Sequence, residues 1–234
     1  MKKLFTLSVA ALMLVASLAF DAQPAQAQGP GLVSSILNKM DRNRRSLSSL
    51  RAALTMQKYN AQLRDFDMSY GEMAYLAASG RDANVRVDWT KPVRESLSVT
   101  GGQYTLYRPR LGQAYQGSTR AQQKNTKVNS VLSFAFNMTG TQAKNQFNVE
   151  YEGEGTLENG GPHVWWLKLT PRGGASYQFA EVWVDDSGMP VQTRVTEKNG
   201  DSTLVRLTNI QRNARVSTDE IKIELPAGTK IVKG

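Results

Sequence analysis

Apolar and polar residues alternate most clearly between residues 163 and 210. Alternation with period two is the spacing at which a β-strand buries one of its faces. Short polar turns separate four such segments, and Asp186-Ser187-Gly188 and Asn199-Gly200 supply residues that accept the positive φ of tight turns. These links are too short for a crossover helix, so the sequence predicts an antiparallel meander. The four predicted strands are HVWWLKLTP, SYQFAEVWVDD, MPVQTRVTEKN and DSTLVRLTNIQ.

A second set of strands is predicted upstream of the meander. Residues 46–63 alternate as a half-buried strand would, although their Ala and Leu content suits a helix equally well. Residues 147–151 resume the alternation just before the meander, and Ile221 and Ile223 predict one last strand after it. The remaining strands of the upstream set, which has about six members, are predicted at 66–76, 85–89, 97–99, 104–107 and 111–117.

Helical spacing of apolar residues is clear in one place, at residues 33–45. Val33, Ile36, Leu37 and Met40 recur on one side of this segment and charged residues occupy the rest, so the pattern predicts an amphipathic helix. A polar tract at 118–129 then separates the upstream strands from a short apolar segment at 131–136.

Together these elements indicate a mainly β fold with a few short helices. The simplest arrangement is one strongly curved antiparallel sheet of about ten or eleven strands with the helices on its concave side. A closed barrel and a two-sheet sandwich fit the same pattern and stay open as alternatives.

The first 27 residues have the pattern of a secretory signal peptide. Basic residues at positions 2 and 3 precede an uncharged apolar run at 4–20, and Ala25-Gln26-Ala27 forms a small-residue cleavage site. An uncleaved membrane anchor is the alternative interpretation. We expect residues 28–234 to form a single domain, exported without disulfides because the chain has no cysteine.

The formal net charge of +9 bears on possible partners. Nucleic acid would be a candidate for a basic cytoplasmic protein. An exported protein meets anionic membrane surfaces instead, so we expect transient membrane-surface contact and no nucleic-acid binding.

Few residues could carry catalysis. His163 is the only histidine, cysteine is absent, and neither a G-x-S-x-G nor a P-loop pattern occurs. We therefore expect no enzyme, no metal site and no cofactor, with a hydrolase using Glu150, Glu152 and Glu154 as the minority alternative. Trp165 and Trp166 are adjacent and must point to opposite faces of a strand, so each face is covered by protein or lines a cavity for an apolar ligand.

Residues 91–109, KPVRESLSVTGGQYTLYRP, resemble the pattern P-x-x-x-x-L-x-V-x-D-G-x-x-L-W-x-Y-x-P of LolA-type periplasmic carriers of outer-membrane lipoproteins. Collinear matches follow at 167–171, at 179–185 and between 202 and 228. The resemblance implies a half-open barrel with a helical lid over an apolar cavity that holds lipoprotein acyl chains. It also implies two partners, an inner-membrane lipoprotein-releasing transporter and an outer-membrane acceptor, and we expect a periplasmic monomer. A LolA-like lipid-binding sensor or a scaffold for a partner protein is the alternative.

The resemblance also assigns residues to the cavity and the lid. Helix 33–45 and segment 131–136 correspond to lid elements, and Arg81 is placed to substitute for an arginine of the family that contacts the lid. Two departures stand out: the Lys-Arg-Pro triplet of the family is absent, and Gly101 replaces the aspartate before the turn glycine. The implied cavity residues are Met56, Met73, Val85, Val87, Trp89, Leu97 and Val99, and the implied lid residues are Ile36, Met40, Val131, Leu132 and Phe134.

Overall fold

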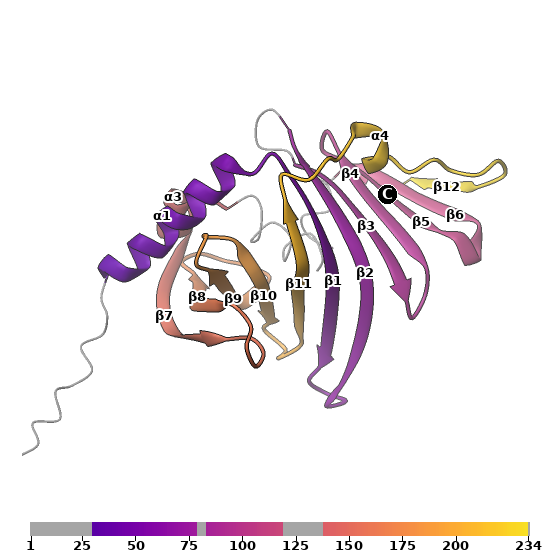
Figure 1. Cartoon of the computed structure of the whole chain (residues 1–234). Helices are drawn as coiled ribbons and strands as arrows, with labels where there is room; N and C mark the ends of the chain where they lie inside the picture. Colours follow the sequence, from indigo (N-terminus) through magenta and orange to yellow (C-terminus); the bar gives the residue numbers. More distant parts are fainter. Residues whose placement is uncertain (1–29, 79–82, 119–137, 234) are drawn as a thin grey trace, which may run out of the picture.

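The computed structural model describes residues 30–78, 83–118 and 138–233. Within them, twelve strands form one open, curved sheet, which confirms the mainly β prediction and excludes both the closed barrel and the sandwich (Figure 1). The strand order is β12-β6-β5-β4-β3-β2-β1-β11-β10-β9-β8-β7. Every neighbouring pair is antiparallel except β12 and β6, which are parallel.

The elements follow one another along the chain as α1 (Pro30–Ser46), β1 (Ser49–Asn60), β2 (Asp65–Ala77), β3 (Ala83–Lys91), β4 (Glu95–Thr100), β5 (Gln103–Arg108), a 3₁₀ turn η1 (Pro109–Leu111), β6 (Gln113–Ser118), α3 (Gly140–Gln146), β7 (Phe147–Thr156), β8 (His163–Pro171), β9 (Tyr177–Asp185), β10 (Pro190–Glu197), β11 (Ser202–Arg212), α4 (Thr218–Ile221) and β12 (Lys230–Lys233).

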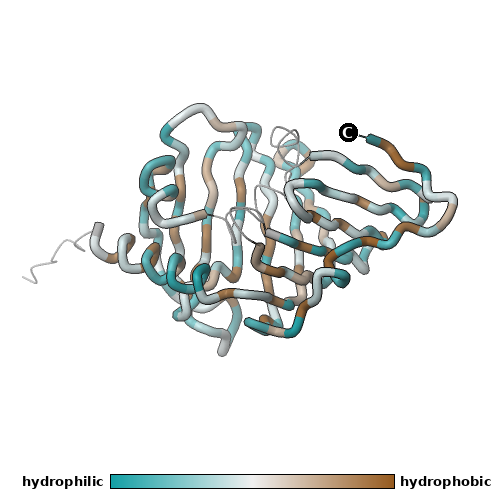
Figure 2. Tube along the Cα trace, turned by 90° about the horizontal axis from the view of Figure 1, so that it is seen from above, coloured by the Kyte–Doolittle hydropathy of each residue, from teal (hydrophilic) through white to brown (hydrophobic). Residues whose placement is uncertain are grey.

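The predicted meander is β8 to β11, with the antiparallel pairing that its short turns require. Gly188 and Gly200 have φ of 86° in the two turns, the left-handed region that glycine enters without steric cost. Apolar and polar positions alternate along the strands (Figure 2). Alternate residues of a strand share a face, so the buried Leu50, Ala52, Leu54 and Met56 of β1 make one face of the sheet apolar.

Helix α1 packs on this apolar face, which we call the concave face. Ile36, Leu37 and Met40 are buried in the same cluster as Leu167 of β8 and Val182 of β9, so the predicted apolar stripe meets the sheet as expected. Figure 1 shows α1 lying across the end of the sheet formed by β7 to β10. Helix α3 lies beside α1 and β7, where a capping box of Thr139 and Gln142 starts it.

The prediction for the end of the chain was wrong. Ile221 closes the short helix α4, whose first turn is capped by Ser217, and the last strand is Lys230–Lys233 instead. Arg86, which alternates with Val87 on β3, donates to the carbonyls of Glu220 at 3.0 Å and Lys222 at 2.8 Å. Helix α4 therefore covers the convex face, whereas the helices were all expected on the concave side.

Candidate functional site

The seven predicted cavity residues all lie on the concave face. Val87 of β3 stands directly opposite Met73 of β2 on one side and Leu97 of β4 on the other, and opposite residues share a face of the sheet. Val85 and Val99 are likewise paired. Alternation along β3 and β1 then places Trp89 and Met56 on the same side.

Most of these side chains are packed rather than open to solvent. Met56, Met73, Val85 and Val87 are buried in the cluster that also contains Ile36 and Met40 of α1. Trp89, Leu97 and Val99 are half-buried, and the first two pack against that cluster. The other predicted lid residues, Val131, Leu132 and Phe134, lie outside the described residues, as does Arg81.

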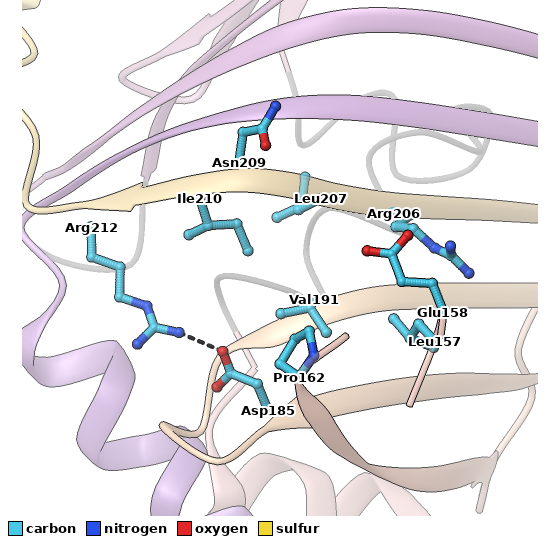
Figure 3. Close-up of a pocket in the computed structure, with 10 residues that line it drawn as sticks. All are labelled: Leu157, Glu158, Pro162, Asp185, Val191, Arg206, Leu207, Asn209, Ile210 and Arg212. Carbon is cyan, nitrogen blue, oxygen red and sulfur yellow. Dashed lines mark hydrogen bonds and ion pairs between the residues drawn. The ribbon is translucent and has the colours of Figure 1, made fainter. Parts of the chain in front are cut away.

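A pocket of about 470 Å³ lies further along the concave side, at the end of the sheet near α1. The loop between β7 and β8 covers strands β10 and β11 here, and the space between loop and strands forms the pocket (Figure 3). Its volume falls within the roughly 300–1,000 Å³ typical of small-molecule sites. The lining residues are Leu157, Glu158, Pro162, Asp185, Val191, Arg206, Leu207, Asn209, Ile210 and Arg212.

The apolar part of the pocket is continuous with the concave face. Leu207 stands opposite Leu54 of β1, two residues from Met56 on the same face, and Val191 belongs to the same buried cluster. Leu157 of the loop and Ile210 of β11 pack against this cluster without being fully buried. An apolar ligand here would therefore contact the core on one side and the β7–β8 loop on the other.

Asp185 is a polar residue of the pocket lining, and its carboxylate accepts several hydrogen bonds. Its Oδ1 accepts hydrogen bonds from the backbone N–H groups of Ser187 and Met189, both at 2.9 Å. Its Oδ2 accepts from Nη2 of Arg212 at 2.5 Å, shown as a dashed line in Figure 3. The carboxylate of Asp185 thus connects the β9–β10 turn to Arg212 at the end of β11. These hydrogen bonds fix the position of the two pocket-lining residues, Asp185 and Arg212, relative to each other.

Helix α1 is fastened to the same turn. Lys39 Nζ lies 3.5 Å from the carbonyl oxygen of Asp186 and 4.1 Å from the ring centroid of Trp165. Asn43 Nδ2 lies 3.4 Å from Sδ of Met189. The site therefore combines the end of α1, the β9–β10 turn and the pocket.

His163 begins β8 near this turn. Its Nδ1 lies 3.0 Å from Oδ1 of Asp186, and its Nε2 lies 3.5 Å from Oε2 of Glu154. Glu150 and Glu152 are exposed on β7. In the part of the chain that the structure describes, no three histidine or acidic side chains form a group that could hold a metal ion.

The sequence did not single out the pocket. Leu207 and Ile210 entered the prediction as residues of the strand DSTLVRLTNIQ, and Asp185 as a residue of the strand SYQFAEVWVDD. The pocket depends on the β7–β8 loop reaching across to β11, several strands away in the sheet, and the local alternation of residues carries no signal for such a contact.

Comparison with known proteins identifies a family. The family model described as "Outer membrane lipoprotein carrier protein LolA" matches residues 51–224, about three quarters of the chain. Among curated proteins, none matches the sequence. The matched range includes the pocket and excludes α1.

Solved structures show the same fold at low identity. A structure of MucB superposes with a TM-score of 0.58 and 16% identity over 87% of this chain and 66% of MucB, so this chain spans less than two thirds of MucB. MucB in complex with MucA(peri) gives 0.51 and 17%, covering 86% of this chain and 62% of that one. An uncharacterized conserved protein from Thermus thermophilus gives 0.54 and 13%, covering 87% of this chain and 99% of that one.

Proposed function

The chain belongs to the LolA family of outer membrane lipoprotein carrier proteins, and from that membership we propose that it binds lipoprotein acyl chains in the periplasm and carries them from the inner to the outer membrane. An inner-membrane transporter would load it and an outer-membrane acceptor would unload it. Residues 1–27 act as the export signal in this proposal, and residues 28–234 form the single carrier domain. Within the described residues, no helix is both long and apolar enough to cross a membrane.

The physical need for such a carrier follows from the cost of exposing an acyl chain to water. Each buried methylene contributes about 0.8 kcal/mol, so a chain of about fourteen methylenes gains roughly 11 kcal/mol on leaving water. A lipidated protein would cross an aqueous compartment very rarely without cover. A carrier needs only an apolar site comparable with the membrane, with no cofactor and no catalytic group.

The observation that carries the proposal is the pocket on the concave side. Val191, Leu207 and Ile210 give it an apolar wall, and the β7–β8 loop covers it. Polar side chains line it as well, among them Asp185 and Arg212, which bind each other. A mainly apolar wall with a few polar groups suits an acyl chain that ends in a polar group.

A fluorescent fatty-acyl probe tests the site. Ile210→Trp should fill the pocket without burying a charge, so we expect probe affinity to fall at least about tenfold while the fold is retained, the equivalent of about 1.4 kcal/mol. Ile231→Trp on the exposed strand β12 is the matched control and should bind like the wild type. Equal affinity in all three proteins would contradict the proposal.

The native cargo can be sought directly. Organic-solvent extraction of the purified protein followed by mass spectrometry should release acyl-containing molecules. Their absence from the extract, together with an unaffected Ile210→Trp variant, would favour the second candidate function.

That second candidate is a scaffold or sensor that binds a partner protein. It is supported by the fold similarity to MucB, which has been solved in complex with MucA(peri). A partner protein would bind equally to the pocket-filled variant, whereas a carrier would lose its cargo.

A further inference from the structure

The solvent-exposed side of α1 carries a concentrated positive charge. Its exposed positions recur at helical spacing and form a single stripe, which we call the α1 outer face: Gly31, Ser35, Asn38, Arg42, Arg45 and Ser46. Arg42 and Arg45 supply two exposed cations, and the half-buried Lys39 lies beside the stripe, whereas Arg44 points toward the sheet near Tyr75. The stripe itself contains no acidic residue.

These arginines are not neutralised by neighbours. Among the described residues, neither Arg42 nor Arg45 has an acidic side chain within ion-pair distance. Asp41 is the one acidic residue of α1, and its Oδ1 accepts from the backbone N–H of Gly140 at 3.0 Å. The charge of the outer face is therefore available to an external anion.

A purely structural role accounts for part of this charge. Arg44 and Arg45 lie in the last turn of α1, where cations stabilise the negative end of the helix dipole. Arg42 lies before that turn, and its exposed charge contributes little to this effect. A dipole role would change the stability of α1 without any dependence on lipid, so the two roles can be distinguished.

The position of the outer face connects it to the pocket. Lys39 and Asn43 contact the β9–β10 turn, and Asp185 at the start of that turn lines the pocket. A flat anionic surface that touches Arg42 and Arg45 would thus lie at the same end of the sheet as the pocket.

The β1–β2 hairpin tip, at the other end of these strands, is the competing surface. Leu63 is 73% exposed and Phe66 55% exposed there. Charges around this tip are balanced, however, since Lys58 and Arg64 are accompanied by Asp65 and Asp67. The tip therefore has no electrostatic preference for an anionic surface.

From the charge and position of the α1 outer face, we propose that it docks on membranes through anionic phospholipid headgroups, which brings the pocket next to the bilayer. The docking itself does not require acyl-chain transport; only its purpose rests on the proposed function. Each basic side chain near such a surface contributes about a factor of five in partition.

The test is partition of the full chain into vesicles. We compare zwitterionic phosphatidylcholine vesicles with vesicles in which about one lipid in three is phosphatidylglycerol. The ratio of the two partition coefficients isolates the electrostatic part of the binding, because apolar contacts contribute to both coefficients.

The double variant Arg42→Ala with Arg45→Ala should lower this ratio about thirty-fold, and Arg42→Lys with Arg45→Lys should restore it. Raising NaCl from about 0.05 M to about 0.5 M should weaken wild-type binding.

A charge-matched control removes Lys58 of β1 and Lys198 of the β10–β11 turn, both exposed at the opposite end of these strands. This double alanine variant should keep the wild-type ratio. An equal fall in both variants would mean that net charge alone acts, and an unchanged ratio in the arginine variant would mean that α1 does not dock; either result overturns the proposal. Loss of binding in Leu63→Ala with Phe66→Ala, with the arginine variant unaffected, would also overturn it and assign the contact to the hairpin tip.

The fatty-acyl probe separates the two proposals. The arginine variant should bind the probe in solution with wild-type affinity, since neither arginine lines the pocket. Loss of docking with retained probe binding supports the inference. Retained docking with retained probe binding refutes the inference and leaves the carrier function standing.

Discussion

Arg194 of β10 stands directly opposite Glu181 of β9, and its guanidinium binds the carboxylate through two nitrogens, Nε and Nη2. The Glu181 side chain is only 4% exposed, whereas that of Arg194 is 37% exposed. Arg194 also lies over the ring of Trp183, which stacks on Trp166 with 5.4 Å between ring centroids. The convex face of the meander is thus covered by its own side chains rather than by a helix.

Removing the arginine alone should destabilise the protein. Arg194→Met leaves the Glu181 carboxylate buried without its cation, so we expect a loss of about 2 kcal/mol in urea unfolding, less than for a fully buried pair. Replacing both residues, with Arg194→Met and Glu181→Leu, should recover most of this loss. A single variant as stable as the wild type would contradict this interpretation.

Gly188 should be required for the packing of α1. A Cβ there would overlap the carbonyl group of Lys39 and lie 2.9 Å from the backbone nitrogen of Met40, and its φ of 86° disfavours other residues. We expect Gly188→Ala to cost at least about 1–3 kcal/mol and to raise amide hydrogen exchange in α1. Gly174→Ala, with open space around the added methyl group, is the matched control and should be neutral.

Two positions on the concave face should respond differently to an added carboxylate. Val87 is 0% exposed, so Val87→Asp buries a charge and should unfold the protein, with a cost above about 3 kcal/mol. Leu97, directly opposite and half-buried, should tolerate aspartate, because its side chain can keep the charge in contact with water. Circular dichroism and urea unfolding check both outcomes. An unfolded Leu97→Asp variant would mean that this part of the face is solid core.

Tyr177 should make stability fall at high pH. Burial raises the pKa of its phenol from 10.0 to about 12. Between these values the unfolded chain has released the proton and the folded chain has kept it, so the unfolded state gains stability as the pH rises. The contribution of Tyr177 is therefore complete below about pH 10 and lost as the pH approaches 12. Urea unfolding at about pH 9 and pH 11 should show a smaller decrease for Tyr177→Phe than for the wild type. An equal decrease in both proteins would show that other groups cause it.

The strands of the meander could be predicted well because their signals are local. The prediction HVWWLKLTP coincides with β8, and Asn199-Gly200 marks the turn between β10 and β11. Trp165 faces Lys39 of α1, and Trp166 stacks on Trp183 of the convex face, so the prediction of opposite faces is confirmed.

The errors arose where a local sequence pattern was compatible with two different secondary structures. Ile221 and Ile223 have strand spacing, but Ser217 accepts a hydrogen bond from the N–H of Glu220 and starts a helical turn instead. The pocket could not be predicted at all, since it requires the β7–β8 loop to contact β11. Alternation specifies which face a side chain occupies and leaves unspecified what covers that face.

The pairing of β12 with β6 has a consequence for association between molecules. Strand β6, Gln113–Ser118, has no charged residue, and a long uncharged edge invites pairing with another chain. Strand β12 covers that edge and presents Lys230 and Lys233 to the outside, where like charges repel an approaching copy. The last strand of the chain thus protects the protein against aggregation, and a chain shortened by these residues should form β-rich aggregates at concentrations where the intact protein stays dispersed.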